Sequence, residues 1–297
     1  MGLDERLPDA PLTVGVDGSE PSLRATDWAA DEAALRGVPL RLVYASMWEH
    51  YEGEGLAADF GRPFEEIRGE HIVEAAAQRA RERSPGLQVT AEVLPDGPET
   101  VLPQESLRAR ALVVGTRGRS GVAEALLGSV SLIVAAHAQC PVIVVRGSHD
   151  NQAQAGIHRR VLLGVGADAK GSAAVRFAYD EARIRGVPLE AVRAWRRPAH
   201  ETTDNPLMGG TTARPHEEQA VRELEAALED APAELDLRRR TAEGHAHRVL
   251  EDASRHADLL VIGARRRHGH LGLQLGRITH AVLHHSACPV AVVPQQT

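Results

Sequence analysis

The stretch GTRGRSGVAEALLGS, residues 115 to 129, combines glycines, arginines and a serine in a pattern that could hold a phosphate. It continues the apolar run ALVV, which is typical of a buried strand. Gly115 and Gly118 let the backbone turn so that N–H groups point into one concavity, and such a concavity binds oxyanions. Gly128 and Ser129 open the helix-like run SVSLIVAAHA, and the N–H groups at a helix start attract anions. A flexible loop with the serine as an ordinary helix cap also fits these residues.

A second candidate is Asp17, which follows the apolar run LTVGV directly. If that strand lies beside ALVV, the Asp17 carboxylate faces Gly115 across a crevice, where it could accept a hydrogen bond from a ribose hydroxyl or an adenine amino group. Alternatively, Asp17 or Ser19 satisfies the first amides of the next helix. The two roles do not exclude each other.

The composition argues against several classes of protein. The net charge of -7 over 297 residues is unlike that of a nucleic-acid-binding protein. Apolar runs are too short to cross a bilayer, and the acidic start MGLDERLPDA is unlike a secretory signal, so we expect a cytoplasmic protein without a membrane partner. Cys140 and Cys288 each precede a Pro-Val run, which indicates buried free thiols. With 3% aromatic residues, a base-binding pocket would be built from aliphatic side chains and backbone.

The chain contains an internal repeat. RGVPLRLVYA begins at residue 36 and recurs as RGVPLEAVRA 149 positions later (185 minus 36), and DEAALRG recurs as DEARIRG at the same offset. Both copies end in a CPV run, QCPVIVV in the first and ACPVAVV in the second. The sequence therefore predicts a duplicated domain, with residues 1–150 and 158–297 as the two copies and the polar segment 146–158 as the linker.

Each copy alternates strand-like and helix-like segments. In the first copy we expect strands at 12–16, 40–45, 88–93, 111–115 and 141–145, and helices at 21–36, 63–83, 98–109 and 129–138. Gly37 is suited to ending the first helix. This alternation predicts two tandem doubly wound α/β domains, each with a five-stranded parallel sheet flanked by helices. Ligands of such sheets bind where the first and fourth strands meet, and the two apolar closing strands could cover each other across a pseudo-twofold axis.

Three features together resemble the universal stress protein family in its tandem two-domain form: the aspartate after the first strand, the G-x2-G-x9-G-S loop after the fourth, and the closing CPV strand. The resemblance covers nearly the whole chain. It implies a nucleotide-binding α/β fold, ATP binding in many members, pairing through the last strands and a role in stress responses. It also implies that Asp17 and Ala45 line an adenosine pocket, the latter through its backbone. Phosphate-binding positions implied in the same way are Gly115, Gly118, Gly128 and Ser129, with Mg²⁺ accompanying the nucleotide and no dedicated protein ligand for it.

The second copy departs from this pattern. Its loop is GARRRHGHLGLQLGR, in which Arg266 and Arg277 replace the second glycine and the serine, while Gly263 and Gly276 are retained. Gly166 stands at the position of Asp17, and Asp168 at that of Ser19. An arginine adds bulk where the loop needs bare backbone, so we expect no intact second ATP site, with an altered anion site as the alternative.

Histidines gather near the end of the second copy. His280 and His284 are one helical turn apart and could face one metal ion, but no carboxylate pair accompanies them. We therefore expect a solvated or interfacial helix face and no metal site.

Motifs of catalysis are missing from the sequence. Neither glycine loop contains the GxxxxGK[ST] pattern of P-loop ATPases, and no GxSxG elbow occurs. We therefore predict no catalytic residues and a cytoplasmic, ATP-binding regulatory stress-response protein that holds nucleotide mainly in its first copy, with little or slow hydrolysis. A nucleotide-independent interaction scaffold and a slow adenine-nucleotide hydrolase are the alternatives. A homodimer and an unknown protein partner are compatible with each.

Overall fold

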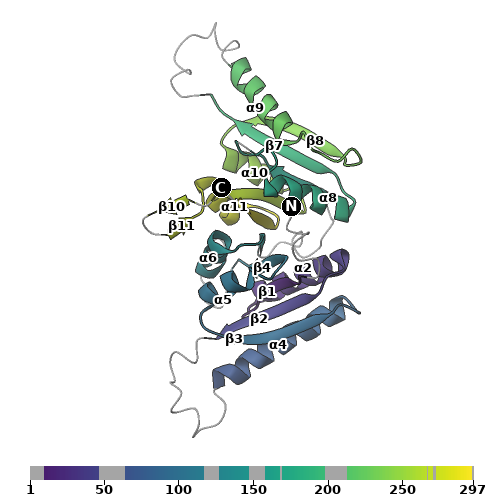
Figure 1. The fold of residues 1–297 in the computed structure, drawn as a ribbon, viewed down its shortest axis with the longest axis vertical. Helices are drawn as coiled ribbons and strands as arrows, with labels where there is room; N and C mark the ends of the chain where they lie inside the picture. The colour runs from purple at the N-terminus through teal and green to yellow at the C-terminus, as the bar shows by residue number, and fades with distance from the viewer. Residues whose placement is uncertain are drawn as a thin grey trace.

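A computed structural model describes residues 10–46, 64–116, 127–146, 158–167, 169–197, 213–265, 267–269 and 272–295. The first half contributes five strands: β1 (Leu12–Gly15), β2 (Leu40–Ser46), β3 (Val89–Pro95), β4 (Ala111–Gly115) and β5 (Val142–Val145). The second half contributes β6 (Val161–Gly164), β7 (Leu189–Trp195), β8 (Leu237–Glu243), β9 (Leu259–Arg265) and β12 (Val290–Gln295). All ten form one sheet in the order β3-β2-β1-β4-β5-β12-β9-β6-β7-β8, which runs through both halves (Figure 1).

The sheet is parallel within each half and antiparallel at its centre. β1 pairs in parallel with β2 and with β4, so the first and fourth strands meet as predicted. β5 and β12 pair antiparallel, with Ile143 opposite Ala291. The predicted α/β class is thus confirmed, and the two closing strands cover each other. The two predicted sheets join into one because each closing strand would otherwise be an unpaired apolar edge.

Helices cover both faces of the sheet. One face carries α2 (Glu20–Arg36), α4 (Phe64–Arg83), α8 (Ala173–Arg185) and α9 (Ala213–Ala227), whose buried residues share one core cluster. The opposite face carries α5 (Pro98–Glu105), α6 (Ser129–His137), α10 (Ala246–Ser254) and α11 (Arg277–His285), which share a second cluster. A short antiparallel ribbon, β10 (Arg267–Gly269) and β11 (Gly272–Gln274), precedes α11.

A local signal sets the end of α2 but not that of α5. α2 ends at Gly37, which adopts a φ of 64° and donates its N–H to the carbonyls of Ala33 and Ala34, as its sequence position predicts. α5 ends at Glu105, short of the predicted residue 109. Residues 106 to 108 form a turn instead, in which the Ser106 hydroxyl donates to the Pro103 carbonyl and accepts the Gln139 N–H.

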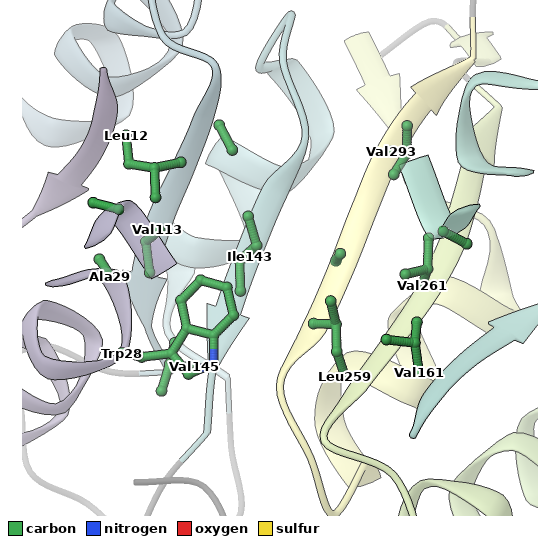
Figure 2. Packing of buried hydrophobic residues seen from close by; sticks show 14 of the residues in the cluster. Leu12, Trp28, Ala29, Val113, Ile143, Val145, Val161, Leu259, Val261 and Val293 are labelled. Atoms are coloured by element: carbon green, nitrogen blue, oxygen red, sulfur yellow. The ribbon is translucent and has the colours of Figure 1, made fainter. Parts of the chain in front are cut away.

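The core continues across the central junction. Figure 2 shows side chains of one buried cluster on both sides of the junction, among them Val113, Ile143 and Val145 of the first half and Leu259, Val261 and Val293 of the second. The two halves therefore share a hydrophobic core in addition to the pairing of β5 with β12.

A buried group of four charged residues also joins the halves. Arg36 of α2 contacts Glu32 and Glu181 at 2.5 Å each, and Arg185 of α8 contacts the same two carboxylates. The four side chains are between 1% and 9% exposed. We refer to Glu32, Arg36, Glu181 and Arg185 as the interface quartet. The Phe177 ring lies 5.9 Å from the Arg36 guanidinium, and the Trp28 ring lies 5.7 Å from that of Arg185.

Both cysteines are free and buried, as predicted. Burial raises the pKa of Cys140 and of Cys288 to about 12, so neither thiol forms a thiolate readily. In the described ranges, no helix combines the length and the apolar character that crossing a bilayer requires.

Candidate functional site

A cavity of about 220 Å³ opens at the carboxyl ends of β1, β2 and β4, where the strand order predicts a ligand site. Its walls are mostly aliphatic, in keeping with the low aromatic content of the chain. The lining residues come from the ends of β1, β2 and β4 and from helices α2, α5 and α6: Gly15, Val16, Asp17, Ser22, Val43, Tyr44, Ala45, Pro98, Leu102, Val114, Gly115, Val130 and Ser131.

Three of the predicted site residues, Asp17, Ala45 and Gly115, line this cavity together. Gly128 and Ser129 stand just before the lining residues Val130 and Ser131, at the start of α6. Gly118 lies outside the described residues.

Packing requires a glycine at position 115. A Cβ atom at this position would lie 2.7 Å from the carbonyl carbon and oxygen of Pro21, so the end of β4 touches the first turn of α2 through bare backbone. The Gly115 carbonyl accepts a 2.6 Å hydrogen bond from the Ser131 hydroxyl. These contacts hold the end of β4 against both α2 and α6.

The glycine loop closes at the start of α6. The Gly128 N–H donates to the Thr116 carbonyl at 2.6 Å, so the two ends of the loop meet. Gly128 is the N-cap residue, and Ser129 is the first helical residue and exposed. The alternative in which the serine caps the helix is therefore wrong. Among the described residues no side chain caps α6, so its first amides, with their partial positive charge, have no side-chain acceptor and could bind an anion.

Asp17 organises the turn that leads into α2. Its Oδ1 accepts the Ser19 N–H at 3.0 Å and the Ser19 hydroxyl at 2.6 Å. Ser19 is the N-cap of α2, and its Oγ accepts the Ser22 N–H at 3.4 Å. The helix-capping interpretation of this loop is thus confirmed. A bond from Asp17 to a ribose or a base stays a prediction, and its place in the cavity wall is compatible with it.

Sequence reasoning missed the apolar walls of the cavity. Val43 and Tyr44 lie near the end of β2, and Leu102 of α5 covers Gly15 so closely that a Cβ there would lie 2.9 Å from a Leu102 methyl group. Their signal in the sequence is weak, because valine and leucine at strand and helix positions are equally typical of an ordinary core.

The corresponding crevice of the second half differs. Arg193 takes the place of Tyr44, donates to the Val165 carbonyl at 3.2 Å and pairs with Glu223. A Cβ on Gly263 would meet the side-chain amide of Gln295. Arg277 is the first residue of α11 and exposed, with Gly276 as its N-cap. Arg193 and Arg277 thus bring charged side chains to positions that hold Tyr44 and Ser129 in the first half.

The start of α8 differs from that of α2. α8 has 13 residues against 17 in α2, and its N-cap is Ser172. The residue that matches Ser19 in role is thus Ser172, and not position 168, because the shorter helix starts later. Asp168 and Arg266 themselves lie outside the described residues.

One histidine of α11, His284, contacts the first half, whereas His280 and His285 are exposed. The His280 and His284 ring centroids are 4.5 Å apart. The Leu127 N–H of the first half donates to Nδ1 of His284 at 3.5 Å, which confirms an interfacial helix face. Within the part of the chain that the structure describes, no three His, Cys, Asp or Glu side chains gather as metal ligands would.

Comparison with known proteins agrees with this architecture. The model of the family described as "Universal stress protein family" matches residues 11–146 and again 158–294. Universal stress protein Rv2005c of Mycobacterium tuberculosis is 32% identical over 294 residues, which cover 96% of this chain and 97% of that protein. Universal stress protein Rv1996 of the same organism is 31% identical over 306 residues, covering 96% and 95%. The tandem arrangement of two such domains is therefore confirmed.

Solved structures share the fold. The crystal structure of a universal stress protein from Archaeoglobus fulgidus matches with a TM-score of 0.62 at 18% identity, over 95% of this chain and 98% of that one. Protein PA1789 from Pseudomonas aeruginosa, described as functionally unknown, matches with a TM-score of 0.61 at 17% identity, over 97% and 94%. At these identities the likeness establishes the fold alone.

Proposed function

Because this chain belongs to the universal stress protein family, we propose that it is an ATP-binding regulatory protein of the stress response that holds its nucleotide in residues 1–150. Residues 158–297 then form a second domain with a degenerate loop. The cytoplasm is the proposed location, and the two buried free thiols suit its reducing conditions.

The observation that supports this proposal is the cavity beside the uncapped start of α6. Its aliphatic walls suit a base and a sugar, and Asp17 stands in the wall with a carboxylate that can accept from hydroxyl donors. The phosphates would extend toward Gly128 and Ser129, where helix amides favour negative charge. In this arrangement Mg²⁺ is held by the phosphates.

The cavity offers little for hydrolysis. Among the described lining residues Asp17 is the only carboxylate, and its Oδ1 already accepts two bonds from Ser19. A general base must reach the attacking water with a favourable proton affinity. We therefore propose a protein whose conformation or partner affinity follows nucleotide occupancy, with slow turnover at most.

The test uses position 129 and its counterpart in the second domain. Ser129 and Arg277 are each the first residue of a helix and exposed, so glutamate at either position should leave the fold intact. Freshly purified protein is denatured, and the released nucleotide is identified and quantified by mass spectrometry. We expect one ATP per chain in the wild type, loss of it in Ser129→Glu, where the new charge repels phosphate, and retention in Arg277→Glu.

Other outcomes identify the alternatives. If no nucleotide is released and added ATP does not bind, the protein is a nucleotide-independent interaction scaffold. Loss of ATP in Arg277→Glu alone would place the site in the second domain. Turnover of about 1 s⁻¹ or faster, the range of ordinary enzymes, would indicate a hydrolase.

A further inference from the structure

The last turn of α11 is bound to the first half at two consecutive residues. Arg146, just after β5, donates from Nη1 to the Leu283 carbonyl at 2.8 Å. The next residue of the helix, His284, accepts the Leu127 N–H at 3.5 Å. The Arg146 contact therefore fixes the C-terminal end of α11. The His284 contact joins that end to Leu127, which directly precedes the N-cap of α6.

Leu127 lies at the start of α6, next to the residues predicted to bind phosphate. It directly precedes Gly128, whose own N–H is fixed by the Thr116 carbonyl. The side chain of Leu127 packs against the core cluster that contains Val282 and Leu283 of the second half. Two successive amides at the start of α6 are thus held, one by the second half and one by the first.

These contacts have no counterpart on the other side of the pseudo-twofold axis. With the offset of 148 between Gly115 and Gly263, His284 corresponds to Ala136, which has no polar side chain, and Arg146 corresponds to Pro294, which has no donor. Among the described residues, the two contacts are therefore made only around α6 of the first half. That is also the half whose loop retains both the second glycine and the serine.

We propose that His284 is a positioning residue for Leu127 and the start of α6 in the first half, so that the second half completes a site which it does not itself contain. This inference rests on the proposed function. To accept the Leu127 N–H, Nδ1 must carry its lone pair, which places the ring proton on Nε2. Binding of nucleotide at α6 and docking of α11 then stabilise each other, because a coupling between two sites is reciprocal.

Three single variants of the full chain separate this role from a general effect on stability. His284→Leu removes the acceptor. His284→Asn restores an acceptor, since the asparagine Oδ1 lies close to where Nδ1 was. His285→Leu changes an exposed neighbour on the same turn and serves as the control.

Two readouts are needed. The first is hydrogen exchange of the Leu127 amide, followed by NMR in the absence of nucleotide. The second is ATP affinity by calorimetry. We expect His284→Leu to speed Leu127 exchange and to weaken ATP binding about three- to tenfold, the range of one hydrogen bond. His284→Asn should recover most of both, and His285→Leu should change neither.

The outcomes distinguish this inference from the proposed function. If the wild type binds ATP and His284→Leu binds it equally well, the positioning role is wrong and the proposed function stands. Unchanged exchange of Leu127 in a folded His284→Leu protein overturns the inference as well. Should the wild type bind no nucleotide at all, the proposed function fails, and the coupling fails with it.

Discussion

Arg36 of α2 reaches across the centre of the molecule to Glu181 of α8, and Arg185 returns the contact to Glu32. The four side chains are almost completely buried, so each charge depends on the others for compensation. Like the pairing of β5 with β12, these ion pairs join the two halves, so their removal should lower the stability of both halves together.

Replacing Arg36 with methionine should destabilise the protein by about 3 to 5 kcal/mol, because two carboxylates would be left buried with one arginine. The control is Arg83→Met, whose partner Asp31 is 32% exposed, and which should cost under about 1 kcal/mol. Urea unfolding monitored by circular dichroism measures both. Equal free energies of unfolding for the two variants would show that the quartet contributes no more than a surface pair.

The contribution of Glu181 to stability should fall as the pH rises from about 4.5 to about 7. Burial raises the pKa of Glu181 from its ordinary 4.5 to about 7, with repulsion from Glu32 adding to the effect and Arg36 and Arg185 opposing it. Because the folded pKa lies above the unfolded one, the carboxyl takes up a proton on folding. Its contribution is full below the unfolded pKa and is lost as the pH rises through the folded pKa.

The free energy of unfolding, measured by urea titration from about pH 5 to about pH 8, should therefore decline more steeply in the wild type than in Glu181→Gln. A glutamine cannot titrate, so its variant lacks this contribution. If both proteins show the same slope, Glu181 does not take up a proton in this range.

Alanine at Gly115 should be costly, whereas alanine at the matching Gly263 should not. The new methyl group at 115 would meet the Pro21 backbone at 2.7 Å, and we expect a loss of about 1 to 3 kcal/mol. At Gly263 it would meet the flexible end of Gln295, which can move aside, so the loss should stay below about 1 kcal/mol. Thermal unfolding without nucleotide compares the two, and similar melting temperatures would contradict the packing role of Gly115.

Asp17→Asn should separate the structural role of this residue from a ligand role. The asparagine Oδ1 can still accept the Ser19 N–H, so stability should change by less than about 1 kcal/mol. If the carboxylate also bonds a nucleotide hydroxyl, ATP affinity should fall about tenfold or more, as for a hydrogen bond to a charged group. Calorimetry measures the ATP affinity of both proteins. An unchanged affinity would show that Asp17 only stabilises the turn before α2.

Much of the fold could be predicted because its signals are local. The run ALVVG predicts β4 with the bounds that the structure has, and Gly37 predicts the end of α2. The position of the cavity follows from strand order, since β1 beside β4 brings the loops of Asp17 and Gly115 to one edge.

The interface quartet could not be predicted in the same way. Its four residues belong to the repeated DEAALRG and DEARIRG segments, but the repeat indicates only that the two helices have similar sequences. That α2 and α8 face each other depends on the antiparallel junction of β5 with β12, and a contact of this kind has no local signature.

The role of Ser129 was also beyond local reasoning. Glycine followed by serine before a helix fits either residue as the cap. In the structure Gly128 has an extended backbone and its carbonyl accepts the Leu132 N–H, which makes it the N-cap. Its own N–H bonds the Thr116 carbonyl, a contact between two ends of a loop 12 residues apart (128 minus 116) that no local pattern predicts.

The antiparallel junction has a consequence for how the two copies could change over time. Since β5 and β12 belong to one chain, the linker keeps the halves at a high effective concentration, and their pairing survives dilution that would separate two independent subunits. In a symmetric dimer of identical subunits the interface surface must be complementary to a copy of itself. In this chain the surface of each half needs to be complementary only to that of the other half. Under that condition one copy can diverge in its loop, as the arginines after Gly263 show, while still supplying β12 and α11 to its neighbour.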